Sequence, residues 1–377
     1  MQLLKSLPVG LLGLSLAATY ASAQETIKIG VIQPLTGSVA YNGTTDVNGS
    51  KLAADEINAK GGVLGKKIEL IVEDGQCKPA DTVNAAEKLI QRDKVVALAG
   101  AFCSSATLAA MPVAQNYKIP LVTGVSSAAS LTEKGNQWFF RATETDALLA
   151  KAFAKILFNE LKLRKVAYIG VNDDFGRGGV AEFEKQMQAL GATTVMKEYF
   201  EHGTSDFYTL LTKLKASGAD GAFVAAETQD GSIFVKQKAE LGIQTKVFGV
   251  GSWATSDFIK LTGASSEGIY AAVPYASTMT SPRNTVFVDA YTQRYKEAPG
   301  KYSAAGYNVI NILAQAIDRA NSTDPEKLRE ALTKTSYDGP NGHFQFDSTG
   351  QAYGFTLVLV QLTSGVPKVV ASTTVER

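Results

Sequence analysis

Residues 101–107, AFCSSAT, bring together the side chains of this sequence that most readily suggest chemistry. Cys103, Ser104 and Ser105 follow an apolar run and precede a segment with a helical pattern. A thiol or hydroxyl in such a place can act as a nucleophile when a base lies beside it, and a cysteine can be one ligand of a metal ion. The same side chains can also hold a ligand without reacting. Which of these applies decides whether the protein is an enzyme.

The partners that catalysis would need are missing from the sequence. The only histidines are His202, in a predicted loop after a strand, and His343, at a turn into a strand. No G-x-S-x-G nucleophile turn, phosphate-binding loop or G-x-G-x-x-G motif is present. Two histidines and two cysteines provide no metal site of the usual ligand types. The sequence therefore predicts a protein that is not an enzyme and has neither a metal nor a cofactor.

The N-terminus predicts export from the cytoplasm. Lys5 is followed by the apolar run VGLLGLSLAA (9–18) and by Ala-Ser-Ala at 21–23. A charge, a short apolar run and a small-x-small site together are typical of a cleaved signal peptide, and the run is too short to span a bilayer. We predict that residues 1–23 are a signal peptide cleaved after Ala23 and that the mature protein is periplasmic.

The two cysteines, Cys77 and Cys103, are interpreted in that context. Exported proteins meet an oxidising environment, so one disulfide is expected, with a free catalytic cysteine as the alternative. The bond would close a loop of about 27 residues and, on a chain-entropy estimate, stabilise the fold by about 3 kcal/mol.

Composition excludes partners that are recognised by strong charge. Without residues 1–23 the chain keeps 354 residues, with 36 basic and 36 acidic side chains. Nucleic-acid and anionic-membrane surfaces need a basic patch, which this balance does not favour. With 45% hydrophobic residues and no second long apolar run, the chain is predicted to be globular. Its length suggests about two domains. We also expect a monomer whose ligand is a small molecule.

The elements that must position the serines form two successive α/β units. In the first unit we predict strands at 26–34, 66–75, 94–100 and 119–124 and helices at 47–62, 80–93 and 105–117. In the second we predict strands at 164–171, 193–200, 220–226 and 245–251 and helices at 180–192, 206–219 and 232–243. Two helices (286–298 and 304–321) and a hairpin (355–370) follow. This alternation predicts two parallel sheets with helices on both faces.

Loops rich in small hydroxyl residues follow the predicted strands. AGAFCSSAT (99–107) and TGVSSAAS (123–130) follow two strands of the first unit, and AAETQDGS (225–232) follows a strand of the second. Open parallel sheets bind ligands beyond the carboxyl ends of their strands, where helix N-termini offer free N–H groups. The serines either cap helices or bind a small anion through N–H and hydroxyl groups. Two such loops on successive strands favour anion binding.

Several motifs resemble one known family over nearly the whole mature chain. The matching stretches are IKIGVIQPLTGSVAYNG, AADEINAKGGVLGKKIELIVEDGQCKP, CSSAT, IPLVTGVSSAASLT, VNDDFGRG and VKQKAELGI. They are similar to those of the periplasmic leucine/isoleucine/valine-binding proteins, the type I solute-binding proteins of branched-chain amino-acid ABC importers. The resemblance implies two doubly wound lobes that are joined by three hinge crossings and close on a ligand. We expect lobe 1 at 24–143 plus 275–350 and lobe 2 at 144–274 plus 351–377.

The resemblance also implies roles for individual residues. Cys77 and Cys103 match the family's disulfide pair. Ser104, Val125 and Ser127 match positions that hold the carboxylate and ammonium of the ligand. The remaining matches are apolar or lie at the cleft mouth: Phe102 in the side-chain pocket, Phe175 as an aromatic cover from the second lobe, and Tyr41 or Asn42 at the mouth of the first.

Two positions depart from the pattern of the branched-chain binders. After DGAFV this chain has Glu227 where they have a tyrosine. After TKVFG it has Gly251 where they have the acidic residue that pairs with the ligand ammonium, and Ser252 and Trp253 follow. We expect that Glu227 takes over the ammonium and that Trp253 packs on the ligand side chain. The alternative is that Glu227 is a solvated helix cap, favoured by the helix dipole, so that the ligand need not carry an amine.

The predicted function is therefore delivery of a small amino acid, or an amino-acid-like carboxylate, to the permease subunits of an ABC importer. A second possibility is an amine-free aromatic or short-chain carboxylate or a small amide. A third is a sensor that reports its ligand to a membrane regulator. An exported hydrolase or dehydrogenase is disfavoured by the missing motifs.

Overall fold

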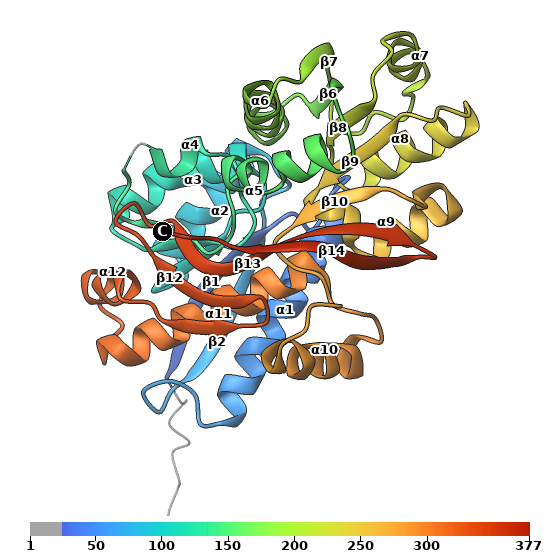
Figure 1. Cartoon of the computed structure of the whole chain (residues 1–377). Helices are drawn as coiled ribbons and strands as arrows, with labels where there is room; N and C mark the ends of the chain where they lie inside the picture. Colours follow the sequence, from blue (N-terminus) through green and yellow to red (C-terminus); the bar gives the residue numbers. More distant parts are fainter. Residues whose placement is uncertain (1–24, 134) are drawn as a thin grey trace, which may run out of the picture.

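Two sheets with helices on their faces form the molecule, one fully parallel and the other parallel with an added antiparallel part (Figure 1). The computed structural model describes residues 25–133 and 135–377. The predicted signal peptide lies outside the described residues. Within those two ranges, no helix combines the length and apolar character needed to cross a membrane.

The first sheet has five parallel strands in the order β2-β1-β3-β4-β5. Its strands are β1 (Thr26–Gln33), β2 (Lys67–Asp74), β3 (Ala97–Gly100), β4 (Leu121–Thr123) and β5 (Phe139–Arg141). Its inner strands are almost completely buried. The continuous apolar runs in the sequence predicted this burial, because such runs are typical of a sheet that is covered on both faces. The predicted fold class is confirmed by this sheet together with the next.

The second sheet is larger and mixed, in the order β11-β12-β13-β10-β9-β8-β6-β7, with β14 paired to β13. Its parallel part comprises β6 (Lys165–Val171), β7 (Thr193–Phe200), β8 (Gly221–Ala225), β9 (Lys246–Val250) and β10 (Tyr270–Val273). The antiparallel part comprises β11 (Tyr337–Gly339), β12 (Gly342–Phe346), β13 (Ala352–Thr363) and β14 (Val366–Thr374). The predicted C-terminal hairpin is β13–β14, which runs across the molecule beside both lobes (Figure 1).

Helices cover the faces of both sheets. In the N-terminal half they are α1 (Ala40–Ala59), α2 (Pro79–Gln91), α3 (Ser104–Tyr117), α4 (Ser130–Glu133) and α5 (Asp146–Asn159). Next come α6 (Asp174–Ala189), α7 (Tyr208–Ala216), α8 (Thr228–Glu240) and α9 (Ser256–Thr262), with short 3-10 turns η1 (Gly251–Ala254) and η2 (Gly263–Ser266). The last three are α10 (Pro282–Tyr295), α11 (Lys301–Ala320) and α12 (Pro325–Thr333) (Figure 1). Of these, α11 packs on α1 and contacts β3 of the first sheet.

Helix α1 begins seven residues earlier than the pattern predicted. The extra turns contain threonine, asparagine and glycine, which have low helix propensity in isolation. Close packing against α11 accounts for the difference. A Cβ on Gly49 would lie 1.9 Å from the carbonyl oxygen of Ser303, and one on Gly306 would lie 2.1 Å from that of Asp46. Tertiary contact between the two backbones therefore overrides local propensity here.

The predicted disulfide is confirmed. Cys77, in the loop after β2, is bonded to Cys103, the residue that precedes α3, and their Cα atoms are 5.3 Å apart. The bond ties the loop after β2 to the loop after β3. The first serine-rich loop is thus fixed at the carboxyl end of the sheet.

Candidate functional site

A small cavity lies between the carboxyl ends of the strands of the two sheets, with about 10 Å³ of free space, which is room for about one water molecule. From the first sheet it is lined by residues after β3 and β4, and from the second by residues after β6, β7 and β8. The lining residues are Phe102, Cys103, Ser104, Val125, Ser126, Ser127, Asp173, Phe175, His202, Glu227 and Lys301.

Six of the eight residues expected to contact the ligand line this cavity. They are Phe102, Ser104, Val125, Ser127, Phe175 and Glu227. The two hydroxyl-rich loops of the first sheet therefore meet the loops of the second sheet at one point. Strand order explains the meeting, because the carboxyl ends of parallel strands share one edge of each sheet.

The serines of the first sheet differ in what their hydroxyls do. Ser104 is the first residue of α3, and its Oγ accepts a hydrogen bond from the backbone N–H of Ala128 at 3.2 Å. Ser126 donates to the carbonyl oxygens of Ala101 and Phe102, each at 2.9 Å, so its hydroxyl joins the two loops. The hydroxyl proton of Ser104 is not used in that bond and remains available to a ligand.

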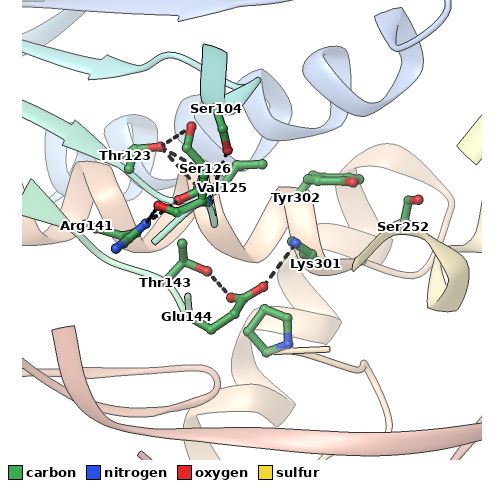
Figure 2. Close-up of polar contacts among 12 residues, drawn as sticks. Ser104, Thr123, Val125, Ser126, Arg141, Thr143, Glu144, Ser252, Lys301 and Tyr302 are labelled. Atoms are coloured by element: carbon green, nitrogen blue, oxygen red, sulfur yellow. Dashed lines mark hydrogen bonds and ion pairs between the residues drawn. The ribbon is translucent and has the colours of Figure 1, made fainter. Parts of the chain in front are cut away.

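Arg141, which the sequence analysis missed, holds the second serine loop in place. Its guanidinium is completely buried and donates to the carbonyl oxygens of Ala128 at 2.6 Å and Ser126 at 3.4 Å (Figure 2). It also donates to the side chain of Gln351, which lies between β12 and β13, at 2.6 Å. Burial lowers the pKa of Arg141 to about 10, so the group stays charged at neutral pH. The only sequence signal of this role is that the short apolar strand FFR (139–141) ends in a charged residue.

Glu227 forms the acidic wall of the cavity from the second sheet. It precedes α8 at the N-cap position but makes no capping hydrogen bond, and it is 8% exposed, so it is not a solvated cap. Its Oε2 accepts from the hydroxyl of Tyr302 at 2.8 Å and from Nδ2 of Asn42 at 3.3 Å. Burial raises the pKa of Glu227, and the charge of Lys301 opposes that effect. Among the described residues, no hydrogen bond is made to its other oxygen, Oε1.

Lys301 and Glu144 form a buried ion pair beside the cavity that the sequence analysis also missed. Nζ of Lys301 lies 3.3 Å from Oε1 of Glu144, and both side chains are nearly inaccessible to solvent (Figure 2). Thr143 donates its hydroxyl to the other oxygen of Glu144. Lys301 lies 157 positions from Glu144 in sequence, and no local pattern marks either as a partner of the other.

A charged cluster closes the cavity at the loop after β7. The Nε2 atom of His202 lies 3.0 Å from Oδ2 of Asp173, and its Nδ1 lies 3.7 Å from Oδ2 of Asp230. Burial lowers the pKa of His202, but the hydrogen bonds to the two carboxylates outweigh burial and raise the pKa to about 10. The imidazolium is therefore charged at neutral pH and offers no lone pair for general-base catalysis.

The two remaining predicted residues lie away from the cavity. Trp253 is completely buried in the core of the second sheet, where its Nε1 donates to the carbonyl oxygen of Ala226 at 2.8 Å and its ring stacks on Phe258. The expectation that it packs on the ligand is therefore corrected. Tyr41 is 36% exposed, and its hydroxyl donates to Glu297 at 3.0 Å. Its neighbour Asn42 is the residue that reaches Glu227.

A metal site has no support in the part of the chain that the structure covers. Residues 25–133 and 135–377 contain no group of three or more His, Cys, Asp or Glu side chains arranged to hold a metal ion. The cysteine of AFCSSAT is bonded to Cys77 and cannot be a nucleophile in that state. The arrangement is suited to holding a ligand by hydrogen bonds and charge.

Comparison with known proteins agrees with this geometry. Residues 26–366 match the family model described as periplasmic binding protein. The chain is 30% identical over 336 residues, or 88% of each chain, to an amino acid binding protein of Pseudomonas aeruginosa. It is 27% identical over 91% of its length and 92% of the relative's to the leucine-, isoleucine-, valine-, threonine- and alanine-binding protein of the same organism.

Two solved structures that resemble the chain contain different ligands. The branched-chain amino-acid binding protein LivJ of Streptococcus pneumoniae, in complex with isoleucine, is 28% identical, with a TM-score of 0.85 and coverage of 94% and 100% of the two chains. A solute-binding protein of Rhodopseudomonas palustris, in complex with 3,4-dihydroxybenzoic acid, is also 28% identical, with a TM-score of 0.84 and coverage of 93% and 98%.

Proposed function

Because the chain belongs to the periplasmic binding protein family, we propose that it captures a small amino acid between its two lobes and delivers it to an ABC importer. The relatives of this chain include amino-acid binding proteins of Pseudomonas aeruginosa. The proposal includes export to the periplasm after cleavage at Ala23, work as a monomer with permease subunits, and no chemical change of the ligand.

The observation that supports an amino acid is the pairing of opposite groups across one cavity. On the first sheet, α3 begins at Ser104, and its N-terminal N–H groups and the nearby hydroxyls suit a carboxylate. On the second sheet, Glu227 offers a carboxylate oxygen that no described residue uses. A free amino acid carries one carboxylate and one ammonium, which match these two walls. Phe102, Val125 and Phe175 supply the apolar part of the lining.

Closure of the lobes is the proposed binding step. Glu227 accepts hydrogen bonds from Tyr302 on α11 and Asn42 on α1, two helices that pack on each other, so one carboxylate joins the two halves of the cleft. In this scheme the first lobe (24–143 and 275–350) binds the carboxylate first. The second lobe (144–274 and 351–377) then brings Phe175 and Glu227 over the ligand. The closed form presents the surface that the permease recognises.

A second candidate is a carboxylic acid without an amine. The relative of Rhodopseudomonas palustris in complex with 3,4-dihydroxybenzoic acid favours it, because that protein is as similar to this chain as the isoleucine complex is. In that case Lys301 would supply the charge that balances Glu227. The charges of the cavity wall are compatible with both ligand classes. The change in ligand affinity on replacing Glu227 distinguishes them.

A thermal-shift screen tests the proposed function. A ligand that binds only the folded protein raises the melting temperature, by an amount that grows with its concentration above Kd. Purified protein is heated with each of the twenty amino acids, with the deaminated acid of each and with a set of benzoates. We expect amino acids to raise the melting temperature. A response to amine-free acids alone would support the second candidate, and conversion of any ligand into a product would refute the proposal that no chemistry takes place.

A further inference from the structure

Lys301 occupies a position that the stability of its own helix does not explain. It is the first residue of α11, after Gly300, and only 7% of it is exposed. The N-terminus of a helix carries partial positive charge, so a cation there is unfavourable, and burial adds the cost of removing the ammonium from water. A buried lysine in such a place is expected to have a partner that compensates for both costs.

The partners within the described residues satisfy the ammonium only in part. An ammonium has three N–H donors. Nζ of Lys301 makes one hydrogen bond within the described part of the chain, a long one of 3.3 Å to Glu144. The ring of Tyr302 adds a cation–π contact at 5.5 Å. Two N–H donors are thus left without an acceptor from this chain, on a side chain that borders the cavity.

The opposite wall is shaped to admit this ammonium. Gly251, which follows β9 in the second sheet, has a φ of +55°. A Cβ at this position would lie 2.9 Å from Nζ of Lys301, so a larger residue would require the end of the lysine side chain to shift. The glycine therefore allows a charge from the helix of one lobe to reach the loop of the other. Figure 2 shows the ammonium of Lys301 between the ring of Tyr302 and the carboxylate of Glu144.

We propose that Lys301 contacts the ligand and selects amino acids whose side chain ends in an oxygen acceptor, a carboxylate or a carboxamide. This inference rests on the proposed function and adds which chemical group ends the side chain of the ligand. The α-carboxylate lies at the serines, the α-ammonium at Glu227, and the side-chain oxygen accepts from Lys301. An aliphatic side chain would instead leave two donors of a buried ammonium without acceptors, which lowers affinity.

Isothermal titration with matched ligands tests the inference. L-glutamine, L-glutamate and L-methionine have side chains of similar length, and only the first two end in oxygen acceptors. We expect the wild-type protein to bind L-glutamine or L-glutamate at least tenfold more tightly than L-methionine. Lys301→Met replaces the ammonium by an apolar group of similar length. We expect it to weaken binding of the preferred ligand at least tenfold and to change binding of L-methionine by less than threefold.

An exposed lysine outside the cavity provides the matched control. Lys327→Met removes an exposed lysine from α12 and should leave all three affinities unchanged. A wild-type preference below tenfold, or a preference that Lys301→Met retains, overturns the inference while the proposed function stands. If no amino acid binds to the wild-type protein, the proposed function fails and the inference fails with it. Should Lys301→Met not fold, the wild-type preference alone decides.

Discussion

Replacing Glu227 by glutamine tests the acidic wall of the cleft with little change of shape. The amide oxygen can still accept the hydrogen bonds that Oε2 receives from Tyr302 and Asn42. The amide nitrogen then takes the place of Oε1, the oxygen that no described residue uses. Glu227→Gln therefore removes the charge and turns one acceptor into a donor, while the contacts between the lobes are kept.

The size of the effect follows from the kind of bond that is lost. A hydrogen bond between an ammonium and a buried carboxylate contributes about 1.5–3 kcal/mol. At about 1.4 kcal/mol for each factor of ten, the affinity for an amino acid should fall about 10- to 150-fold. The deaminated acid has no ammonium, so its affinity should change less than about threefold.

Isothermal titration of L-glutamine and of glutaramate, its deaminated analogue, measures both affinities on the same protein. Glu240→Gln provides the matched control, because it makes the same chemical change at the exposed end of the same helix, α8. Burial raises the pKa of Glu227, so the affinity of the wild-type protein for the amino acid should also fall as the pH is lowered towards that pKa. Equal losses for the two ligands, or no loss for either, would refute the assignment of the ammonium to Glu227.

Three further predictions concern stability. The double replacement of Cys77 and Cys103 by serine should lower the free energy of unfolding by about 3 kcal/mol, as urea denaturation with and without reductant would measure; an unchanged midpoint would contradict it. Burial raises the pKa of Asp146 to about 7, so its carboxyl group binds a proton in the folded state between about pH 4 and 7 and stability should fall as the pH rises through that range. Asp146→Asn should flatten this dependence and exceed the wild type in stability at pH 8, and an unaltered slope would exclude Asp146 as its source. Trp253→Phe removes one of the two donors to the carbonyl oxygen of Ala226, since the hydroxyl of Ser252 remains, and should cost about 0.5–1.5 kcal/mol of stability with ligand affinity kept within twofold. A large loss of affinity would instead return Trp253 to the binding site.

The predictions of fold and family from the sequence depended on features that repeat or lie close together in the chain. Alternating buried strands and amphipathic helices predicted two parallel sheets, and the family motifs predicted the two-lobed fold. Two cysteines in a chain predicted to be exported predicted a disulfide, and the structure contains it. The first turns of α1 were missed because close contact with α11, and not local propensity, makes them helical.

Residues of the cleft were predictable where they follow directly from a strand end. Ser104, Ser127 and Glu227 each come within four residues of the end of a predicted strand, and strand ends meet at one edge of a parallel sheet. Trp253 also follows a strand end, yet its side chain turns into the core. The spacing along the chain fixes where a backbone position lies, but the packing of neighbouring elements fixes the direction of the side chain.

The charges that surround the site were decided by tertiary structure alone. Lys301 meets Glu144 across 157 positions, and Tyr302 meets Glu227 across 75. Such pairs form only when helices from distant parts of the chain return to the same cleft. The cost of burying a charge depends on every group around it, and a linear sequence does not contain that information. The sequence thus determined the fold, the family and the cleft, and the three-dimensional packing determined which charges a ligand meets there.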